Sequence, residues 1–279
     1  MESLVLLSVK LAVGLIMFSL GLNSTMNDAT YLLHNPKLLL KSVISMNIIM
    51  PLIAVVMIFT FGLKEEVKLA LFAISISPIP PLLPNKALKA GGKVSYTVSL
   101  LFIMALLSIV FIPLSVELMG IAILKNLYVS PLVIIKVMGL TLIGPLLIGL
   151  IINKAVPAFA LKIKKIVSIT AMILLIAGII PLLIKLMPVV ITLFGNLTLV
   201  SILIFIFTGL LFGHLLGGPV EDDRTVLALT SSTRHPGIAM VICLTVMPEQ
   251  KLAVAVILLY LIINVIVSLP YIKWRKKVS

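Results

Sequence analysis

The sequence predicts an all-α integral membrane protein with nine transmembrane segments, two of them interrupted near their middle. Three observations support this class: 61% of the 279 residues are hydrophobic, only 11% are charged, and the mean hydropathy is +1.31. A helix needs about 20 mostly apolar residues to cross a bilayer. Stretches of this kind are centred near residues 12, 50, 74, 106, 142, 176, 203, 233 and 260. The short connections leave no room for a soluble domain, so residues 1–279 are expected to form a single transmembrane domain.

The net charge of +13 is divided among short clusters between the apolar segments, which argues against a nucleic-acid-binding face. Cytoplasmic loops of membrane proteins are enriched in Lys and Arg. If the C-terminal YIKWRKKVS is cytoplasmic, the nine crossings place these residues on the same side: Lys37, Lys41, Lys89, Lys93, Lys154, Lys162, Lys164, Lys165 and Arg224. A smaller set then faces outward: Lys64, Lys68, Lys125, Lys185 and Lys251. We therefore expect a plasma-membrane protein with an external N-terminus, whose first segment is a span rather than a cleaved signal.

The third segment, over residues 66–91, contains a cluster of four prolines. Pro78, Pro80, Pro81 and Pro84 lie close together in ISPIPPLLPNK. A single proline removes one backbone donor and kinks a helix, whereas four at this spacing cannot continue an α-helix. We expect the helix to open here.

The eighth segment, over residues 222–247, carries the polar stretch TSSTRHPGIAMV in its middle. Its hydroxyl side chains offer hydrogen bonds that compete with helical ones, and Pro236 and Gly237 follow them. We expect this helix to open as well.

The two interruptions are expected to face each other, because irregular backbone at membrane depth is tolerated only inside protein or along a wet cavity. They lie five segments apart, and this odd spacing makes the two copies antiparallel. The pattern is typical of transporters built from inverted repeats, whose substrate sites lie at discontinuous helices near the midplane. We assign the repeats to about 1–120 and 128–279.

Acidic side chains are missing from the predicted interior. The carboxylates fall in termini, loops or segment ends: Glu2, Asp28, Glu65, Glu66, Glu117, Glu221, Asp222, Asp223 and Glu249. Proton relays in membranes rely on an intramembrane Asp or Glu, and acid/base catalysis uses paired carboxylates. The single cysteine and three scattered histidines provide no multi-cysteine metal site and no Ser-His-Asp or HExxH arrangement. We therefore expect no enzyme activity, metal site or cofactor.

Basic and amide side chains occupy the interruptions instead: Arg234 and His235 at the second, Asn85 and Lys86 at the first. A charge near the bilayer centre costs about 3 kcal/mol. The acidic run 221–223 is about 11 residues from Arg234, or about 16 Å along a helix, which is too far for direct pairing. Snorkelling to the membrane surface is the alternative for Lys86, and His235 can instead bond a freed carbonyl group.

The chain resembles the bile acid:sodium symporter family over nearly its whole length. The resemblance is strongest in GLIMFSLGLNSTMNDATYLLHNPKLLLKSVISMNIIMPLIAVVM, and it continues at Ser77-Pro78 and at Gly237-Ile238-Ala239. Relatives of known structure have ten helices in two inverted five-helix repeats, with core and panel domains. The resemblance implies this fold with the first helix absent, hence a 4+5 arrangement with two crossing discontinuous helices.

The chain departs from the family at the sodium site. Sodium-coupled members bind the ion with a Gln before the first break and a Glu and a Gln in the second, and the corresponding positions are Met46, Thr230 and Arg234. The family's Asn at the first break and its Ser and Thr in the following helix fall on Pro84, Thr97 and Leu101. Most sodium-binding groups are therefore replaced. The comparison implies that Arg234, with Lys86, permanently supplies the charge that sodium supplies in the relatives.

These observations predict a secondary transporter of small organic anions that works by alternating access, with weak or no sodium coupling. The planar fork of arginine suits a carboxylate. The predicted substrate-binding residues are Arg234, His235, Thr230, Ser231, Thr233, Asn85, Lys86, Asn47 and Thr97. Two alternatives stay open: a sodium-coupled organic anion symporter that uses freed carbonyl oxygens and hydroxyls, and a membrane receptor that does not transport its ligand. The expected partners are the organic anion and the lipid bilayer.

Overall fold

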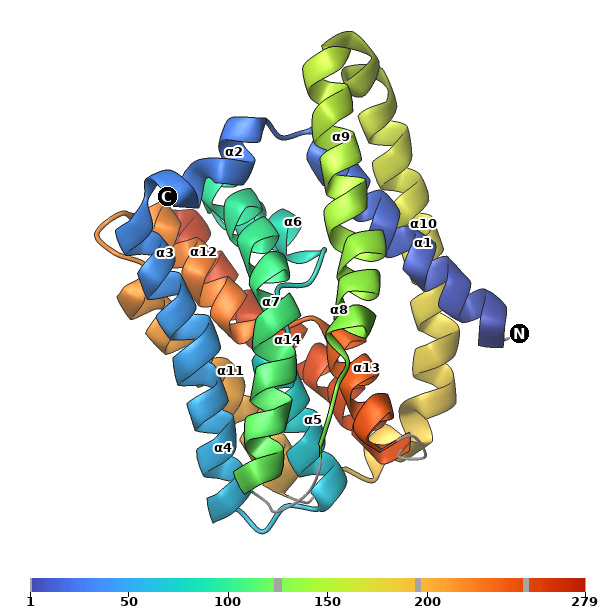
Figure 1. The fold of residues 1–279 in the computed structure, drawn as a ribbon, viewed down its shortest axis with the longest axis vertical. Helices are drawn as coiled ribbons and strands as arrows, with labels where there is room; N and C mark the ends of the chain where they lie inside the picture. Colours follow the sequence, from blue (N-terminus) through green and yellow to red (C-terminus); the bar gives the residue numbers. More distant parts are fainter. Residues whose placement is uncertain (1, 123–126, 194–196, 248–250, 279) are drawn as a thin grey trace.

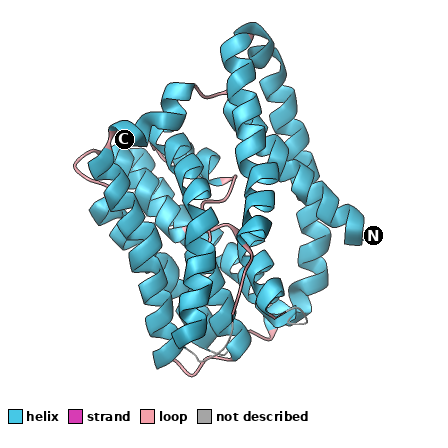
Figure 2. Ribbon diagram, in the orientation of Figure 1, coloured by secondary structure: helices cyan, strands magenta, loops and turns pink. Residues whose placement is uncertain are grey.

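The computed structural model describes residues 2–122, 127–193, 197–247 and 251–278, and all regular elements in these residues are helices (Figure 2). The prediction of an all-α protein is confirmed for this part of the chain. The predictions for Lys125 and Glu249, and for the side chains of Glu2 and Lys251, fall outside it.

The first part of the chain runs from α1 to α7. Its elements are α1 (Glu2–Leu22), α2 (Met26–Thr30), the 3₁₀ helix η1 (Tyr31–His34), α3 (Pro36–Val43), the π-helical η2 (Ile44–Ile49), α4 (Met50–Thr60), α5 (Glu65–Ile76), α6 (Leu83–Lys89) and α7 (Val94–Ala122). A capping box of Thr25 and Asp28 starts α2 and turns the chain sharply after α1. Helices α3, η2 and α4 follow one another without a gap and form one long rod.

The second part runs from α8 to α14. Its elements are α8 (Pro131–Met138), the π-helical η3 (Gly139–Ile143), α9 (Gly144–Ala155), α10 (Pro157–Ile191), α11 (Leu197–Leu216), α12 (Glu221–Ser232), α13 (Pro236–Val246) and α14 (Lys251–Val278). Helices α8, η3 and α9 form a second continuous rod. Pro157 is the first residue of α10, where its missing N–H breaks no helical hydrogen bond.

Six helices of the described chain are long and apolar enough to cross a membrane: Pro36–Thr60, Val94–Ala122, Pro131–Ala155, Pro157–Ile191, Leu197–Leu216 and Leu252–Lys277. A seventh candidate combines Leu7–Leu22 with Met26–His34, which are bent by 105°. The predicted number is larger because it counts each interrupted segment as one span. The separate pieces α5, α6, α12 and α13 have 12, 7, 12 and 11 residues, each shorter than a crossing needs. Nine spans and the inverted repeat over about 1–120 and 128–279 therefore stay predictions.

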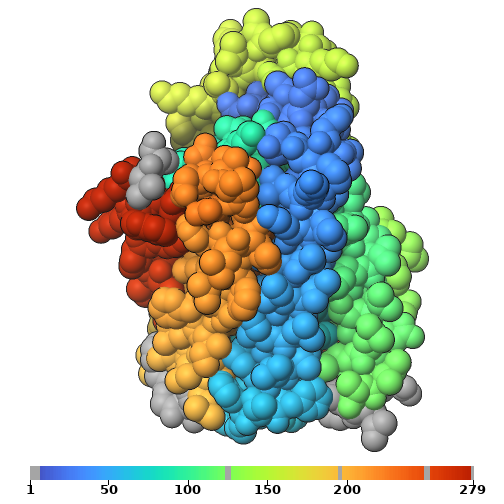
Figure 3. All heavy atoms as spheres, turned by 90° about the vertical axis from the view of Figure 1, so that its left-hand side faces the viewer, coloured from blue at the N-terminus to red at the C-terminus, as the bar shows by residue number. Residues whose placement is uncertain are grey.

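The helices lie in two groups (Figure 1). One group contains α1, α9 and α10, with α1 packed against both partners. In the larger group α11 packs against α12, and α5 contacts both α13 and α14. Figure 3 shows the outer face of this larger group, where the α3–α4 rod lies beside α11. The α9–α10 turn, the α11–α12 turn and the C-terminus all lie toward the upper end of Figure 1.

Glycines make the closest helix contacts in both groups. A Cβ on Gly21 of α1 would lie 2.3 Å from the carbonyl oxygen of Leu146 in α9. Gly209 and Gly213 of α11, and Gly217 directly after it, face α12 at successive turns, and a Cβ on Gly209 would lie 2.6 Å from the Cα of Ser232. Helix α12 therefore rests directly on α11 up to its last residue, and this contact positions the interruption that follows.

Candidate functional site

The two helical interruptions are in direct contact. The first separates α5 from α6 and the second separates α12 from α13. The backbone N–H of His235 in the second donates to the carbonyl oxygen of Pro78 in the first at 2.8 Å. Each irregular segment thus satisfies part of the other's backbone inside the protein, where lipid offers no partner.

Prolines leave the carbonyl oxygen of Ser77 without a helical partner. In a continued α-helix this oxygen would accept from the N–H of residue 81, or from that of residue 80 in a tighter turn. Both positions are proline and have no N–H. A buried carbonyl oxygen in this state needs another donor.

The π-helical turn η2 frees a second carbonyl oxygen by the same mechanism. The N–H of Met50 donates to the carbonyl oxygen of Ser45, five residues earlier. The next donor in this register would be Pro51, which has none. The carbonyl oxygen of Met46 therefore has no partner within its own helix.

The side chain of Arg234 binds both freed oxygens. Arg234 is only 2% exposed. One terminal nitrogen donates to the carbonyl oxygen of Ser77 at 3.2 Å and the other to that of Met46 at 2.5 Å. The guanidinium group thus joins α12–α13 to both the first interruption and the α3–α4 rod. Its Nε is buried and has no hydrogen-bond partner.

A network of neutral side chains binds the chain at residues 232–234. The hydroxyl of Tyr260 and the amide nitrogen of Asn264, both on α14, donate to the carbonyl oxygen of Ser232 at 2.7 Å. The Tyr260 hydroxyl also accepts from the N–H of Arg234 at 2.7 Å, and the amide oxygen of Asn264 accepts from the Thr233 hydroxyl at 3.1 Å. These bonds cap the end of α12 with side chains of another helix. The sequence reasoning missed Tyr260 and Asn264, although a lone amide in an apolar segment was a usable signal.

Lys86 reaches from α6 to the same network. Its Nζ donates to the amide oxygen of Asn264 at 3.0 Å and to the hydroxyl of Thr233 at 3.3 Å. The side chain therefore points inward and does not snorkel. Lys86, from the helix that follows the first interruption, bonds Thr233 in the second, while Arg234 of the second bonds Ser77 in the first.

His235 is placed as a helix cap. Its Nδ1 accepts from the N–H of Ile238 at 3.4 Å, at the start of α13. The neutral ring then carries its proton on Nε2, which is buried without a partner. The ring is thus positioned by α13, with one free nitrogen.

Three of the predicted residues are fully buried and already bonded within the protein. Ser231 pairs with the hydroxyl of Ser45 at 2.7 Å, which joins α12 to η2. The hydroxyls of Thr230 and Thr97 bond carbonyl oxygens of their own helical turns. None of the three lines either of the two cavities beside the interruptions.

Two cavities adjoin the interruptions. The larger, of about 270 Å³, lies between α1, α10 and the first interruption, and its polar lining includes Ser19, Asn23, Asn85 and Ser168. The smaller, of about 10 Å³, is lined by Arg234, Asn47 and seven other residues of η2, α5, the first interruption and α7. Asn85 and Asn47 therefore belong to different cavities, and Arg234 does not line the larger one.

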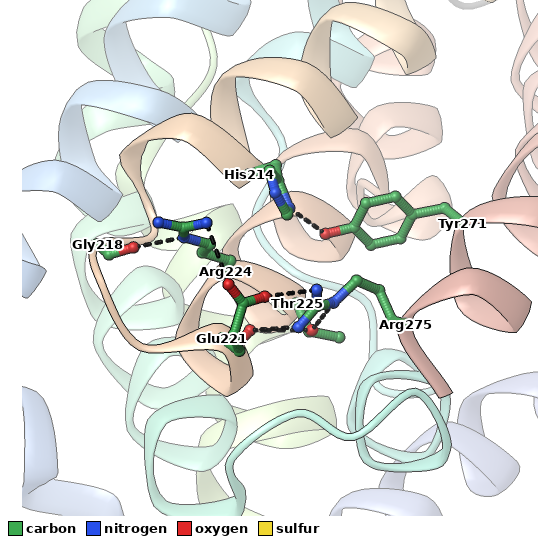
Figure 4. A network of polar contacts seen from close by, with 7 residues as sticks. All are labelled: His214, Gly218, Glu221, Arg224, Thr225, Tyr271 and Arg275. Carbon is green, nitrogen blue, oxygen red and sulfur yellow. Dashed lines mark hydrogen bonds and ion pairs between the residues drawn. The ribbon is translucent and has the colours of Figure 1, made fainter. Parts of the chain in front are cut away.

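A second buried arginine lies at the other end of α12 (Figure 4). Arg275 of α14 pairs with the Glu221 carboxylate at 2.5 Å, and it donates to the Thr225 hydroxyl at 2.8 Å and the Glu221 carbonyl oxygen at 3.0 Å. The hydrogen bond from Arg275 holds the pKa of the Glu221 carboxyl below its usual value. Glu221 also pairs with Arg224 at 3.1 Å. The acidic start of α12 thus neutralises cations at its own end, away from Arg234.

Among the described residues no group of three or more His, Cys, Asp or Glu is placed to hold a metal ion.

Comparison with known proteins identifies the family. No curated protein matches the chain significantly. The profile of the Sodium Bile acid symporter family matches residues 10–187, which is more than half of the chain and includes the first interruption but not the second. The chain therefore belongs to the sodium bile acid symporter family, a family of membrane transporters.

Proposed function

We propose that this protein is a secondary transporter of small organic anions that works by alternating access with weak or no sodium coupling. The observation that carries the proposal is the position of Arg234. Its guanidinium group is buried between the two interruptions and donates to the carbonyl oxygens of Ser77 and Met46. Carbonyl oxygens without backbone donors are the ligands that hard cations such as Na⁺ use at unwound helices. A permanent cation binds them here.

The charge of Arg234 opposes sodium binding at the same place. Two unit charges 4 Å apart repel by about 4 kcal/mol at an effective dielectric constant of about 20. Lys86 adds a second cationic side chain at Thr233 and Asn264. The two residues favour an anionic partner in the surrounding space and disfavour another cation.

The larger cavity is the proposed entrance for the substrate. It lies where the group of α1, α9 and α10 meets the first interruption, which belongs to the larger group of helices. Movement of the two groups against each other would therefore change the shape of this cavity. Its volume of about 270 Å³ is near the lower end of ligand pockets, which favours a small substrate. Its lining offers hydroxyl and amide groups for orientation and contains no charged side chain.

We place the C-terminus in the cytoplasm of a plasma-membrane protein and the N-terminus outside. The α9–α10 and α11–α12 turns and the C-terminus lie at one end (Figure 1), and these segments carry Lys154, Arg224, Arg275 and neighbouring cations. The basic residues then concentrate on the side where membrane proteins place them.

Transport in proteoliposomes tests the proposal. A thermal-stability screen over carboxylates, sulfonates and phosphorylated metabolites, with and without sodium, first selects candidate anions. Uptake of the best candidate is then measured in sodium, potassium and choline media. We expect equal uptake in the three media.

The decisive variant is Arg234→Gln, with Arg275→Gln as the matched control. Arg234→Gln removes the charge at the interruptions, whereas Arg275→Gln removes an equally buried charge from the far end of α12. We expect the first to lose anion uptake and the second to keep it in the fraction that folds. Sodium-dependent uptake by the wild type that survives Arg234→Gln would exclude the proposal. Binding of an anion without any flux would favour a receptor instead.

A further inference from the structure

The charge of Arg234 has no carboxylate partner among the described residues. The carboxylates of Glu65 and Glu221 pair with other cations, Lys68 in the first case and Arg224 and Arg275 in the second. The partners of Arg234 are two carbonyl oxygens, which are neutral. A buried charge without a counter-charge carries a large desolvation cost, and hydrogen bonds to carbonyl oxygens offset only part of it.

Two donors beside Arg234 are not used within the protein. The Nε of Arg234 is buried without a hydrogen-bond partner. Asn47 of η2 is partly buried, and its side-chain amide forms no hydrogen bond with the described residues. A buried donor without a partner, such as this Nε, costs about 1–3 kcal/mol, so a native protein generally provides a partner.

Both residues line the small cavity of about 10 Å³. This volume admits one small particle, a water molecule or a monatomic ion, and excludes a carboxylate with its carbon skeleton. The rest of the lining includes Ser77 and Ser108, whose hydroxyls already donate to carbonyl oxygens of their own helices, and the apolar side chains of Met104 and Phe111. A cavity lined by a cation with an unused N–H and by an amide, and with no acidic residue in its lining, is suited to an anion.

We propose that this cavity binds a small inorganic anion of halide size, which serves as the counter-ion of Arg234. The anion accepts hydrogen bonds from the guanidinium group and the Asn47 amide and supplies the negative charge that the described residues do not. The site is separate from the larger cavity between α1, α10 and the first interruption. The inference goes beyond the proposed function and holds whether or not the protein transports organic anions, because it concerns binding alone.

The test measures the thermal unfolding of the purified protein in detergent. Sodium chloride and sodium bromide are compared with sodium gluconate at equal ionic strength, because gluconate is too large for the cavity. We expect chloride and bromide to raise the Tm by about 2–4 °C over gluconate, the shift that a ligand at several times its Kd gives in a protein of this size. The shift should saturate with halide concentration, whereas a general salt effect would not.

Three variants separate this site from other anion effects. Arg234→Gln and Asn47→Leu should lose the halide-dependent shift, since each removes a proposed ligand. Arg275→Gln should lower the Tm in both salts and keep the shift, because Arg275 has its own carboxylate. If Arg234→Gln does not fold, Asn47→Leu gives the result alone.

Equal melting temperatures in chloride and gluconate for the wild type would overturn the inference. An undiminished halide shift in Asn47→Leu and in Arg234→Gln would also overturn it, because the anion would then bind elsewhere. Neither outcome bears on transport. A failure of this proposal is therefore distinguishable from a failure of the proposed function.

Discussion

The two ends of α12 hold two buried arginines in opposite ways. Arg275, 1% exposed, meets a carboxylate at 2.5 Å near the start of the helix. Arg234, 2% exposed, follows the end of the helix and meets only carbonyl oxygens among its hydrogen-bond acceptors. The first arrangement neutralises its charge and ties α14 to α12. The second leaves the positive charge without a carboxylate partner among the described residues, which is unfavourable for stability and is the reason that we propose a functional role for Arg234.

The difference follows from where acidic residues stand. Three of them occupy the first turn of α12, where the helix dipole favours negative charge. The last turn has hydroxyl residues instead. Removing either arginine therefore tests a different property: stability at one end and transport at the other.

The largest expected effect is the loss of anion uptake in Arg234→Gln. Hydrogen bonds to charged groups are worth about 1.5–3 kcal/mol each, so the loss should be about 10- to 100-fold at constant protein amount. Arg234→Lys keeps the charge but loses the planar fork, so its anion uptake should lie between that of Arg234→Gln and that of the wild type. Uptake of a labelled anion into proteoliposomes measures the series. Uptake that is equally low in Arg275→Gln after correction for folded protein would remove the contrast between the two ends.

A smaller effect is expected from the glycines that seat α12 on α11. In Gly209→Ala the new Cβ would lie 2.6 Å from the Cα of Ser232, and in Gly217→Ala it would lie 2.4 Å from the Cα of Arg224. Each should destabilise the protein by about 1–3 kcal/mol, because the backbone must shift. Only Gly209→Ala should also lower uptake, since it displaces the Arg234 end. Gly62→Ala, where a Cβ meets nothing within 4 Å, is the control.

The neutral bonds around Arg234 should contribute less. Ser45→Ala removes the hydroxyl that pairs with Ser231 at 2.7 Å and leaves that buried group without its cross-helix partner. The expected loss of unfolding free energy is about 0.5–1.5 kcal/mol, measured as a shift in thermal unfolding. Ser115→Ala removes a bond to the same helix only and should change less. If both variants behave alike, the contact between η2 and α12 does not stabilise the site.

The smallest effect is a pH dependence confined to the Arg275 end. The pKa of Glu221 is lowered by its hydrogen bond with Arg275. Its contribution to stability is therefore fully present above the unfolded value of about 4.3 and is lost as the pH falls through the lower folded value. The side chain of Glu221 is 44% exposed, so solvent screening keeps the effect modest. Thermal unfolding between pH 7 and pH 3 should show a decrease in the wild type that is smaller in Glu221→Gln, and an identical decrease in both would remove Glu221 as the cause.

Much of the architecture could be predicted from residue pattern alone. Hydropathy identifies the long apolar helices, and the proline cluster in 78–84 and the polar stretch before Pro236 mark where α5 and α12 end. Both signals are local, because proline and hydroxyl side chains act on backbone within one turn. Arg234 could also be singled out, since a lone cation in an apolar segment is rarely accidental, and the structure buries it between the interruptions; its role in binding stays a prediction.

The partners of the site were harder to predict because they are set by contacts between distant segments. Met46 contributes its carbonyl oxygen, which no side-chain pattern reveals. Asn264 lies in an apolar stretch of α14, and its bonds to Lys86 and Thr233 depend on how this helix packs. The glycines of α11 were a readable signal, because small residues spaced by four permit close helix contact in membranes. The different cavities of Asn85 and Asn47 follow from tertiary packing only.

The guanidinium group is bound by main-chain oxygens that prolines leave without helical donors, so its binding does not depend on which side chains stand at positions 46 and 77. Leucine in place of Met46 would present the same oxygen, whereas alanine in place of Pro51 would return an N–H that competes for it. Among homologues, the prolines should therefore track a fixed internal cation more faithfully than any neighbouring polar side chain does.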